Sequence, residues 1–202
     1  ALYAVANCYF NLGNYERAEE YYHTIHERYP ETVDPLFHMG MCRVNRGDDE
    51  AALGYFTQAL GTIPEGSEEQ AQIYSQMSLI FSRMGLHAKA ATYTDEALKI
   101  YPDNAELIIM KGHELLCQGQ YEESSELFLH ALDLNADNVE RSLFLIGVSM
   151  LENGHCEMSH YILRLLKDNP AIEAEVLYPY LCYCEWTLHT ENFRETLAQS
   201  LA

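Results

Sequence analysis

The chain has 202 residues, of which 48% are hydrophobic and 21% charged, enough apolar material for a folded domain and too much for a disordered tail. Its 31 acidic residues against 12 basic ones give a net charge of −19, which argues against nucleic acid and anionic membranes as partners. Six cysteines are too few for a disulfide scaffold and no run of about 18 apolar residues could insert into a membrane, so we expect a reducing, cytoplasmic location.

Five glycines mark an internal repeat. Gly13, Gly47, Gly85, Gly119 and Gly154 are separated by 34, 38, 34 and 35 residues. One small residue stands seven positions before each glycine and another stands five positions after it. The earlier ones are Ala6, Gly40, Ser78, Gly112 and Gly147, and the later ones are Ala18, Ala52, Ala90, Ser124 and Ser159. This spacing predicts one structural unit that is repeated five times.

Each repeat is predicted to be a hairpin of two antiparallel helices. Apolar residues recur at intervals of three and four between the glycines, and a turn glycine can adopt the left-handed conformation at low cost. Pro30, Pro64 and Pro102 follow the second helix of the first three repeats, where a helix cannot continue. The predicted repeats span about residues 1–32, 33–66, 67–104, 105–138 and 139–170.

Capping signals predict where four of the first helices begin. The signals are Asp34 before Pro35, Ser67 with Gln70, Asp103 with Glu106, and Asp137 with Glu140. Residues 171–202 keep the apolar spacing but lose the repeat pattern, so we expect an atypical hairpin that caps the stack. Pro179 within it predicts a kink or break near Tyr178.

The order of a small residue, a turn glycine, a second-helix alanine and a closing proline resembles the tetratricopeptide repeat (TPR) family over about residues 1–170. The resemblance implies an all-α fold: a right-handed superhelical solenoid of stacked antiparallel hairpins. We expect five repeats plus the capping hairpin in one domain over residues 1–202. The sequence departs from the family pattern because no repeat has the early Trp, Ser124 and Ser159 replace the alanine, and Thr94 replaces an aromatic residue.

In TPR proteins the first helices line a concave groove that usually takes an extended peptide or a helix. By this resemblance, and by counting from each turn glycine, fourteen residues are assigned to the groove. They are Tyr3, Asn7, Phe10, Asn11, Phe37, His38, Met41, Asn45, Gln76, Leu79, Arg83, Met110, His113 and Phe144. Few are charged, which suits the apolar stripe of a partner better than an acidic chaperone tail. The alternative is that this apolar lining packs against neighbouring hairpins or the cap.

The negative charge is expected mostly on second helices and turns. Runs such as Glu16 to Glu20 are interpreted as solvated faces. No phosphate loop, nucleophile elbow, dinucleotide fingerprint or zinc-protease helix occurs, so we predict neither enzyme activity nor a cofactor. His155, Cys156 and His160 form the best metal-ligand cluster, but it lacks a second pair, and no metal is predicted.

The leading hypothesis is a protein-interaction scaffold that binds a peptide or amphipathic helix of another protein in the groove. One alternative is a secretion-type TPR chaperone for apolar export substrates, a class to which the stretch Phe37 to Gly47 is similar. Another is a docking segment of a longer multidomain protein, favoured by a helical pattern that begins at Ala1. A homo-oligomer formed through the first hairpin is a further alternative.

Overall fold

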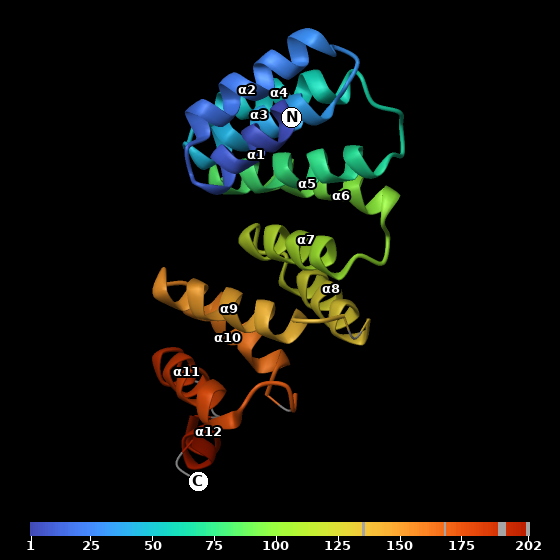
Figure 1. Ribbon diagram of the computed structural model, residues 1–202. Helices are drawn as coiled ribbons and strands as arrows, with labels where there is room; N and C mark the ends of the chain where they lie inside the picture. The colour runs from blue at the N-terminus through green and yellow to red at the C-terminus, as the bar shows by residue number, and fades with distance from the viewer. Residues whose placement is uncertain (135, 168, 190–192, 201–202) are drawn as a thin grey trace. The chain divides into compact units, whose positions relative to one another are not determined.

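The computed structural model describes residues 1–134, 136–167, 169–189 and 193–200. Over these residues it contains twelve helices and no strand, which confirms the predicted all-α class (Figure 1). The chain divides into two compact units, Ala1–Pro102 (unit 1) and Asp103–Ala202 (unit 2). A single solenoid domain over residues 1–202 stays a prediction, and the units are described separately.

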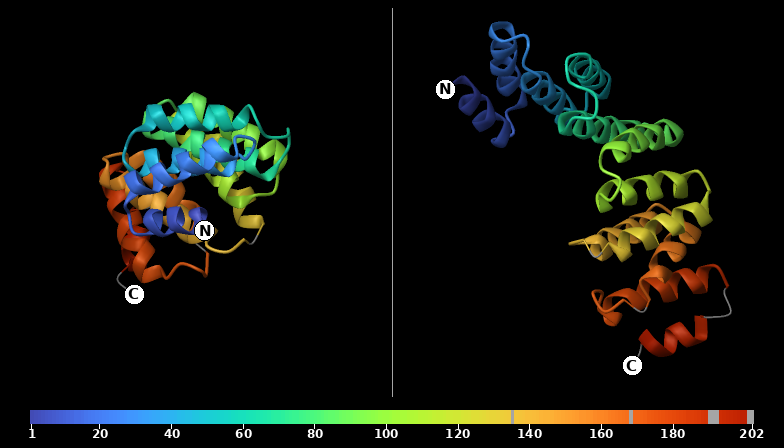
Figure 2. Two further views of the ribbon diagram at one scale, coloured as in Figure 1. Left: turned by 45° about the horizontal axis from the view of Figure 1, so that its top comes forward. Right: turned by 90° about the vertical axis from the view of Figure 1, so that its right-hand side faces the viewer.

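Unit 1 consists of three helical hairpins (Figure 2). The helices are α1 (Leu2–Asn11), α2 (Tyr15–Arg28), α3 (Asp34–Asn45), α4 (Asp49–Leu60), α5 (Glu68–Arg83) and α6 (His87–Ile100). They pair as α1–α2, α3–α4 and α5–α6, called hairpins 1, 2 and 3. The second helix of one hairpin contacts the first helix of the next. One hydrophobic core therefore runs through the unit and includes Tyr22, Met39, Phe56, Ile73 and Ile80.

Unit 2 also consists of paired helices. They are α7 (Ala105–Cys117), α8 (Tyr121–Asp133), α9 (Val139–Glu152), α10 (Cys156–Leu165), α11 (Ala174–Thr187) and α12 (Phe193–Ser200). They pair as α7–α8, α9–α10 and α11–α12, called hairpins 4, 5 and 6, and α10 also contacts α11. The range predicted for the capping hairpin holds α11 and α12, although positions 190–192 and 201–202 of that range lie outside the described residues.

The five turn glycines share one geometry. Their φ angles lie between 72° and 85°, in the left-handed region where a side chain is strained. At the first turn the amide of Gly13 donates to the carbonyl of Phe10 and that of Asn14 to the carbonyl of Tyr9, both at 2.9 Å. The same two bonds recur at the other four turns, a Schellman motif each time. The predicted role of these glycines is confirmed.

Two of the small first-helix residues lie directly under a second-helix ring. A Cβ atom on Gly40 would lie 2.5 Å from Cε1 of Phe56, and one on Gly112 would lie 2.5 Å from Cε1 of Phe128. Both rings are fully buried. The absence of a side chain at these glycines therefore lets the two helices of the hairpin approach each other.

Buried hydroxyl groups stand at the departures from the family pattern. In hairpin 3 the hydroxyls of Ser78 and Thr94 lie 2.7 Å apart, and each also bonds the carbonyl of Ala90. In hairpin 4 Ser124 Oγ donates to the carbonyl of Gly112 at 2.8 Å. These buried hydroxyls are satisfied, so the departures do not leave polar groups without partners.

A predicted side-chain cap forms at one helix only, although α3 begins at Asp34 with Pro35 in its first turn as predicted. The Gln70 amide donates to Ser67 Oγ at 3.2 Å. At α7 the cap is Asn104, whose Oδ1 accepts from the Leu107 amide at 3.0 Å. The predicted side-chain caps that do not form are Asp34, Asp103 and Asp137. Asp and Asn are about equally good caps, so where they are adjacent the sequence does not decide between them.

Of the kink or break predicted near Tyr178, the break is wrong, and the kink stays a prediction. Helix α11 continues from Ala174 through Pro179 to Thr187. Pro179 stands in the second turn, where its missing N–H removes a single bond to the first turn. Leu177 and Leu181 on either side are 1% exposed, so tertiary packing holds the helix together across the proline.

Candidate functional site

The residues assigned to the groove fall on the first helices of both units. Eleven lie on α1, α3 and α5 and are called here the first-helix face of unit 1: Tyr3, Asn7, Phe10, Asn11, Phe37, His38, Met41, Asn45, Gln76, Leu79 and Arg83. Met110 and His113 lie on α7 and Phe144 on α9, in unit 2. Along each helix the residues recur at three and four, so they occupy one side of it.

Four residues of the first-helix face meet in one aromatic cluster around His38. The His38 ring stacks on Tyr22, with centroids 4.9 Å apart and planes 10° apart. It meets Tyr3 (6.2 Å), Phe10 (6.3 Å) and Phe37 (5.6 Å) edge to face. The sequence did not assign Tyr22, a second-helix residue, to this site. This His38 cluster joins α1, α2 and α3, which shows that part of the predicted lining packs between hairpins.

The His38 cluster has little tendency to carry charge. Burial lowers the pKa of His38, against the opposing effect of Asp34. Burial and, to a smaller extent, the nearby Cys42 raise the pKa of Tyr22 to about 12, and its hydroxyl donates to Asn7 Oδ1 at 2.7 Å. Near neutral pH the imidazole and the phenol are therefore both neutral, and the cluster forms an apolar floor.

The first-helix face of unit 1 also carries polar residues. Asn7, Asn11, Asn45 and Arg83 are exposed. Asn45 Nδ2 donates to the carbonyl of Met41 within α3 at 2.8 Å, and Arg83 forms an ion pair with Asp49 at the start of α4. Side-chain amides both donate and accept, which matches the peptide groups of another chain.

The remaining face residues differ in how much they are covered. Leu79 on α5 is 43% exposed, whereas Met41 and Gln76 are half-buried. In unit 2, Phe144 meets Tyr180 of α11 edge to face at 5.6 Å. His113 contacts Glu114 and Cys117 on its own helix.

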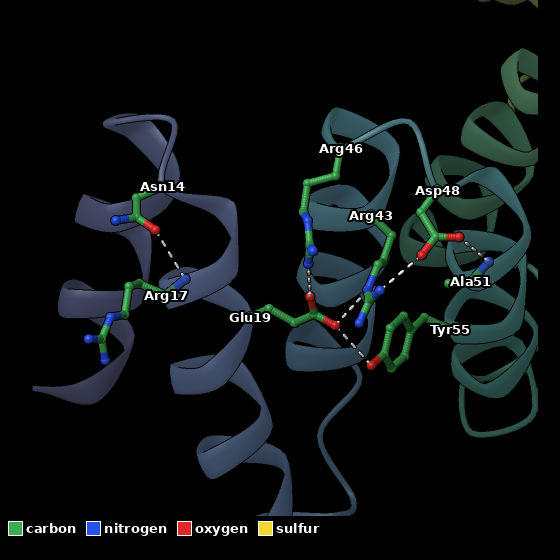
Figure 3. Close-up of polar contacts among 8 residues, drawn as sticks. All are labelled: Asn14, Arg17, Glu19, Arg43, Arg46, Asp48, Ala51 and Tyr55. Carbon is green, nitrogen blue, oxygen red and sulfur yellow. Dashed lines mark hydrogen bonds and ion pairs between the residues drawn. The ribbon is translucent and has the colours of Figure 1, made fainter.

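A polar network on α2, α3 and α4 was missed by sequence reasoning (Figure 3). The Glu19 side chain is only 11% exposed and accepts from Arg43 Nε (2.8 Å), Arg46 Nη1 (3.1 Å) and the Tyr55 hydroxyl (3.1 Å). Arg43 also bonds Asp48 at 2.9 Å. Two guanidinium groups and a phenol thus compensate the buried carboxylate, and they link hairpins 1 and 2.

This Glu19 network corrects the interpretation of the run Glu16 to Glu20. Glu16 and Glu20 are exposed as expected, but Glu19 is buried. A shallow depression beside it is lined by Glu16, Glu19, Glu20, His23, Arg43, Arg46 and Tyr55. A usable signal was Arg43 with Arg46, two of only 12 basic residues, one turn apart at the end of a first helix.

Neither a metal-ligand cluster nor a membrane-spanning helix is found among the described residues. Over the described ranges, no group of three or more His, Cys, Asp or Glu side chains could hold a metal ion. His160, from the best sequence cluster, lies 3.5 Å from Glu185 Oε1 of α11. No helix in the part of the chain that the structure describes is long and apolar enough to cross a membrane.

Comparisons with known proteins agree with these features. Tetratricopeptide repeat models match residues 1–32, 71–104 and 105–138. Human protein O-mannosyl-transferase TMTC1 is 24% identical over 168 residues, or 80% of this chain, and the chain spans only 18% of that relative.

Solved structures show the same fold. A tetratricopeptide repeat protein from Parabacteroides merdae superposes with a TM-score of 0.70 at 18% identity, covering 98% of this chain and 75% of that one. YrrB, described as a TPR protein with an unusual peptide-binding site, gives a TM-score of 0.62 at 16% identity, covering 87% of each chain. The left-handed glycine turns, the small-residue slots and these matches together show that the chain belongs to the tetratricopeptide repeat family.

Proposed function

We propose that the chain is a protein-interaction scaffold and that the first-helix face of unit 1 binds a peptide or amphipathic helix of a partner protein. The observation that carries the proposal is the His38 cluster. It brings Tyr3, Phe10 and Phe37 from two different first helices into one apolar floor, with exposed amides beside it. Peptide binding by YrrB, a protein of the same fold, supports a role of this kind.

Apolar side chains of the partner would lie on Phe37, Met41 and Leu79. Leu79 is already 43% exposed, and the flexible Met41 can adapt to different side chains. Asn7 and Asn11 would bond peptide groups of the partner. Asn11 is exposed at the end of α1, and the described residues offer its side chain no hydrogen-bond partner.

Charge narrows the class of partner. Arg83 is the one residue of the face with a permanent charge, so the contact itself is mainly apolar and amide. Unit 1 as a whole has seven basic and 14 acidic residues, a net charge of −7. Long-range repulsion therefore disfavours acidic segments, and we propose an apolar segment with neutral or basic flanks.

The test uses peptides selected from a random phage-displayed library on the immobilised chain. Met41→Glu places a charge among the apolar residues of the first-helix face and should weaken binding of the selected peptides at least about tenfold. Asn11→Glu tests the amide edge at an exposed position at the end of α1. The matched control is Met84→Glu, the same substitution at a residue that is 51% exposed and outside the face.

The proposal requires both face variants to lose affinity while Met84→Glu retains it, with circular dichroism showing that all three are folded. Full affinity in both face variants would contradict it. An equal loss in Met84→Glu would also contradict it, because added negative charge alone would then explain the effect.

A docking segment of a longer multidomain protein is a second candidate. The human relative favours it, because the chain matches only 18% of that protein's length. In this case the first-helix face would hold a partner close to another domain of the same polypeptide. Sequencing the gene around this segment tests the candidate, and an open reading frame limited to these residues would exclude it.

A further inference from the structure

Helix α7 in unit 2 brings the thiol of Cys117, the imidazole of His113 and the carboxylate of Glu114 into contact. Cys117 Sγ lies 3.8 Å from His113 Nε2, and His113 Nδ1 lies 3.1 Å from Glu114 Oε1. The imidazole therefore bridges the sulfur and the carboxylate. A nucleophile next to a ring that a third group orients is the arrangement that activates cysteines in general.

Burial and charge favour a proton on this ring. The Glu114 side chain is 4% exposed and that of His113 is 27% exposed. Burial on its own would lower the pKa of His113, but hydrogen bonds with Cys117 and Glu114 outweigh it and raise the pKa to about 9. At neutral pH the sulfur thus faces an imidazolium, and a positive neighbour stabilises a thiolate.

The other five cysteines lack this combination, and Cys156, although half-buried, has no histidine beside its sulfur among the described contacts. Cys42 and Cys184 are buried, and burial raises the pKa of both thiols, that of Cys42 to about 12. Burial also raises the pKa of Cys182. Cys8 is exposed on α1, without a histidine beside its sulfur among the described contacts. Cys117 is half-buried, so reagents can reach it, and it has a histidine beside its sulfur.

We propose that Cys117 is a selectively reactive thiol that forms mixed disulfides with low-molecular-weight disulfides, with His113 as the activating residue and Glu114 as the residue that positions the ring. The thiolate of Cys117 attacks one sulfur of R–S–S–R. A Cys117–S–S–R bond forms as the original S–S bond breaks, and the leaving thiolate takes the electron pair and a proton to become RSH. The disulfide is the oxidant, so electrons and atoms balance.

Cys8 serves as the internal reference for the test. The whole chain is treated at pH 7 with limiting 4,4′-dithiodipyridine, a neutral disulfide that the net charge of −19 does not repel. After acid quenching, peptide mass spectrometry gives the rate of modification at each cysteine. Because a positive neighbour stabilises the attacking thiolate, Cys117 should react about five to ten times faster than Cys8 despite its lower exposure.

Two variants separate activation from a structural role. His113→Gln keeps a polar side chain without the charge and should lower the Cys117-to-Cys8 rate ratio about tenfold. His113→Lys restores a positive charge and should give a ratio above that of His113→Gln. The proposal is overturned if Cys117 reacts no faster than Cys8 in the unaltered chain. It is also overturned if the two variants give equal ratios, or if His113→Gln leaves the ratio unchanged.

Discussion

The two helices of hairpin 2 and those of hairpin 3 pack against each other through different residues. In hairpin 2 the ring of Phe56 fills the space left by Gly40, whereas in hairpin 3 the hydroxyls of Ser78 and Thr94 lie 2.7 Å apart at the same two slots. Either a ring over a bare backbone or two short, hydrogen-bonded side chains keeps the helices close. The two positions, seven residues before and nine residues after the turn glycine, are therefore coupled. The size of the residue at one position determines which residue fits at the other.

The same two hairpins differ on the first-helix face. His38 in hairpin 2 is surrounded by four rings, and Gln76 occupies the equivalent slot of hairpin 3. Outside that face, hairpin 3 stacks Phe81 on Tyr93 of α6, with centroids 5.2 Å apart. The repeat therefore determines where side chains stand, and the local choice of residue determines what the face offers to a partner.

The largest effect is expected from Phe56→Thr, which gives hairpin 2 the second-helix residue of hairpin 3. Losing a fully buried ring opposite Gly40 leaves a cavity, and we expect unit 1 to lose about 3–5 kcal/mol of stability. Hydrogen exchange of peptides from α3 and α4, followed during a urea titration, measures this loss of stability. Adding Gly40→Ser should recover part of the loss through a Ser–Thr bond, and a double variant at least as unstable as the sum of the singles would show that the slots are not coupled.

Gly40→Ala alone should cost about 1–3 kcal/mol, because the new Cβ would lie 2.5 Å from the Phe56 ring in a closely packed core. The matched change in hairpin 3 is Ser78→Ala, which removes one hydroxyl while Thr94 keeps its bond to the carbonyl of Ala90. That change should cost about 1 kcal/mol. The same exchange measurement compares them, and a neutral Gly40→Ala would contradict the close approach.

The next largest losses of stability are expected from the ion pairs that join hairpin 2 to hairpins 1 and 3. Glu19→Gln removes the charge that two arginines and a tyrosine share between hairpins 1 and 2, and we expect a loss of about 2 kcal/mol. Asp49→Asn breaks the more exposed pair with Arg83 between hairpins 2 and 3, and about 0.5 kcal/mol should follow. Urea midpoints rank the two variants. Equal losses would mean that the Glu19 network is no stronger than a surface ion pair.

The smallest effect is the pH dependence contributed by His38. Burial lowers its pKa in the folded state below the ordinary value of 6.5, so the unfolded chain takes up the proton more readily. The stability from a neutral His38 is fully present above pH 6.5 and is lost as the pH falls toward the lowered pKa. His38→Gln, the residue of hairpin 3, should show a smaller drop in urea midpoint between pH 7.5 and 5.5. An unchanged drop would assign the pH dependence to other groups.

Local signals made much of the fold predictable. Each turn glycine and the small residues seven positions before and five positions after it can be recognised within about a dozen residues of sequence. The left-handed φ angles confirm the glycines at all five turns. The caps failed where Asp103 and Asn104 are adjacent, because either one can cap a helix. The pairings in the Glu19 network and in the Tyr22–His38 stack were not predicted, because they join residues 16 to 36 positions apart in the sequence. Only Arg43 with Arg46 gave a local signal for the Glu19 network. The partner-binding face itself stays a prediction.

Hydrogen exchange with and without a selected peptide tests the central claim most directly. If the first-helix face of unit 1 is the binding surface, the peptide should protect amides in α1, α3 and α5, over Leu2–Asn11, Asp34–Asn45 and Glu68–Arg83, and leave α2, α4 and α6 unchanged. Protection confined to α2 and α4, or to unit 2, would contradict it.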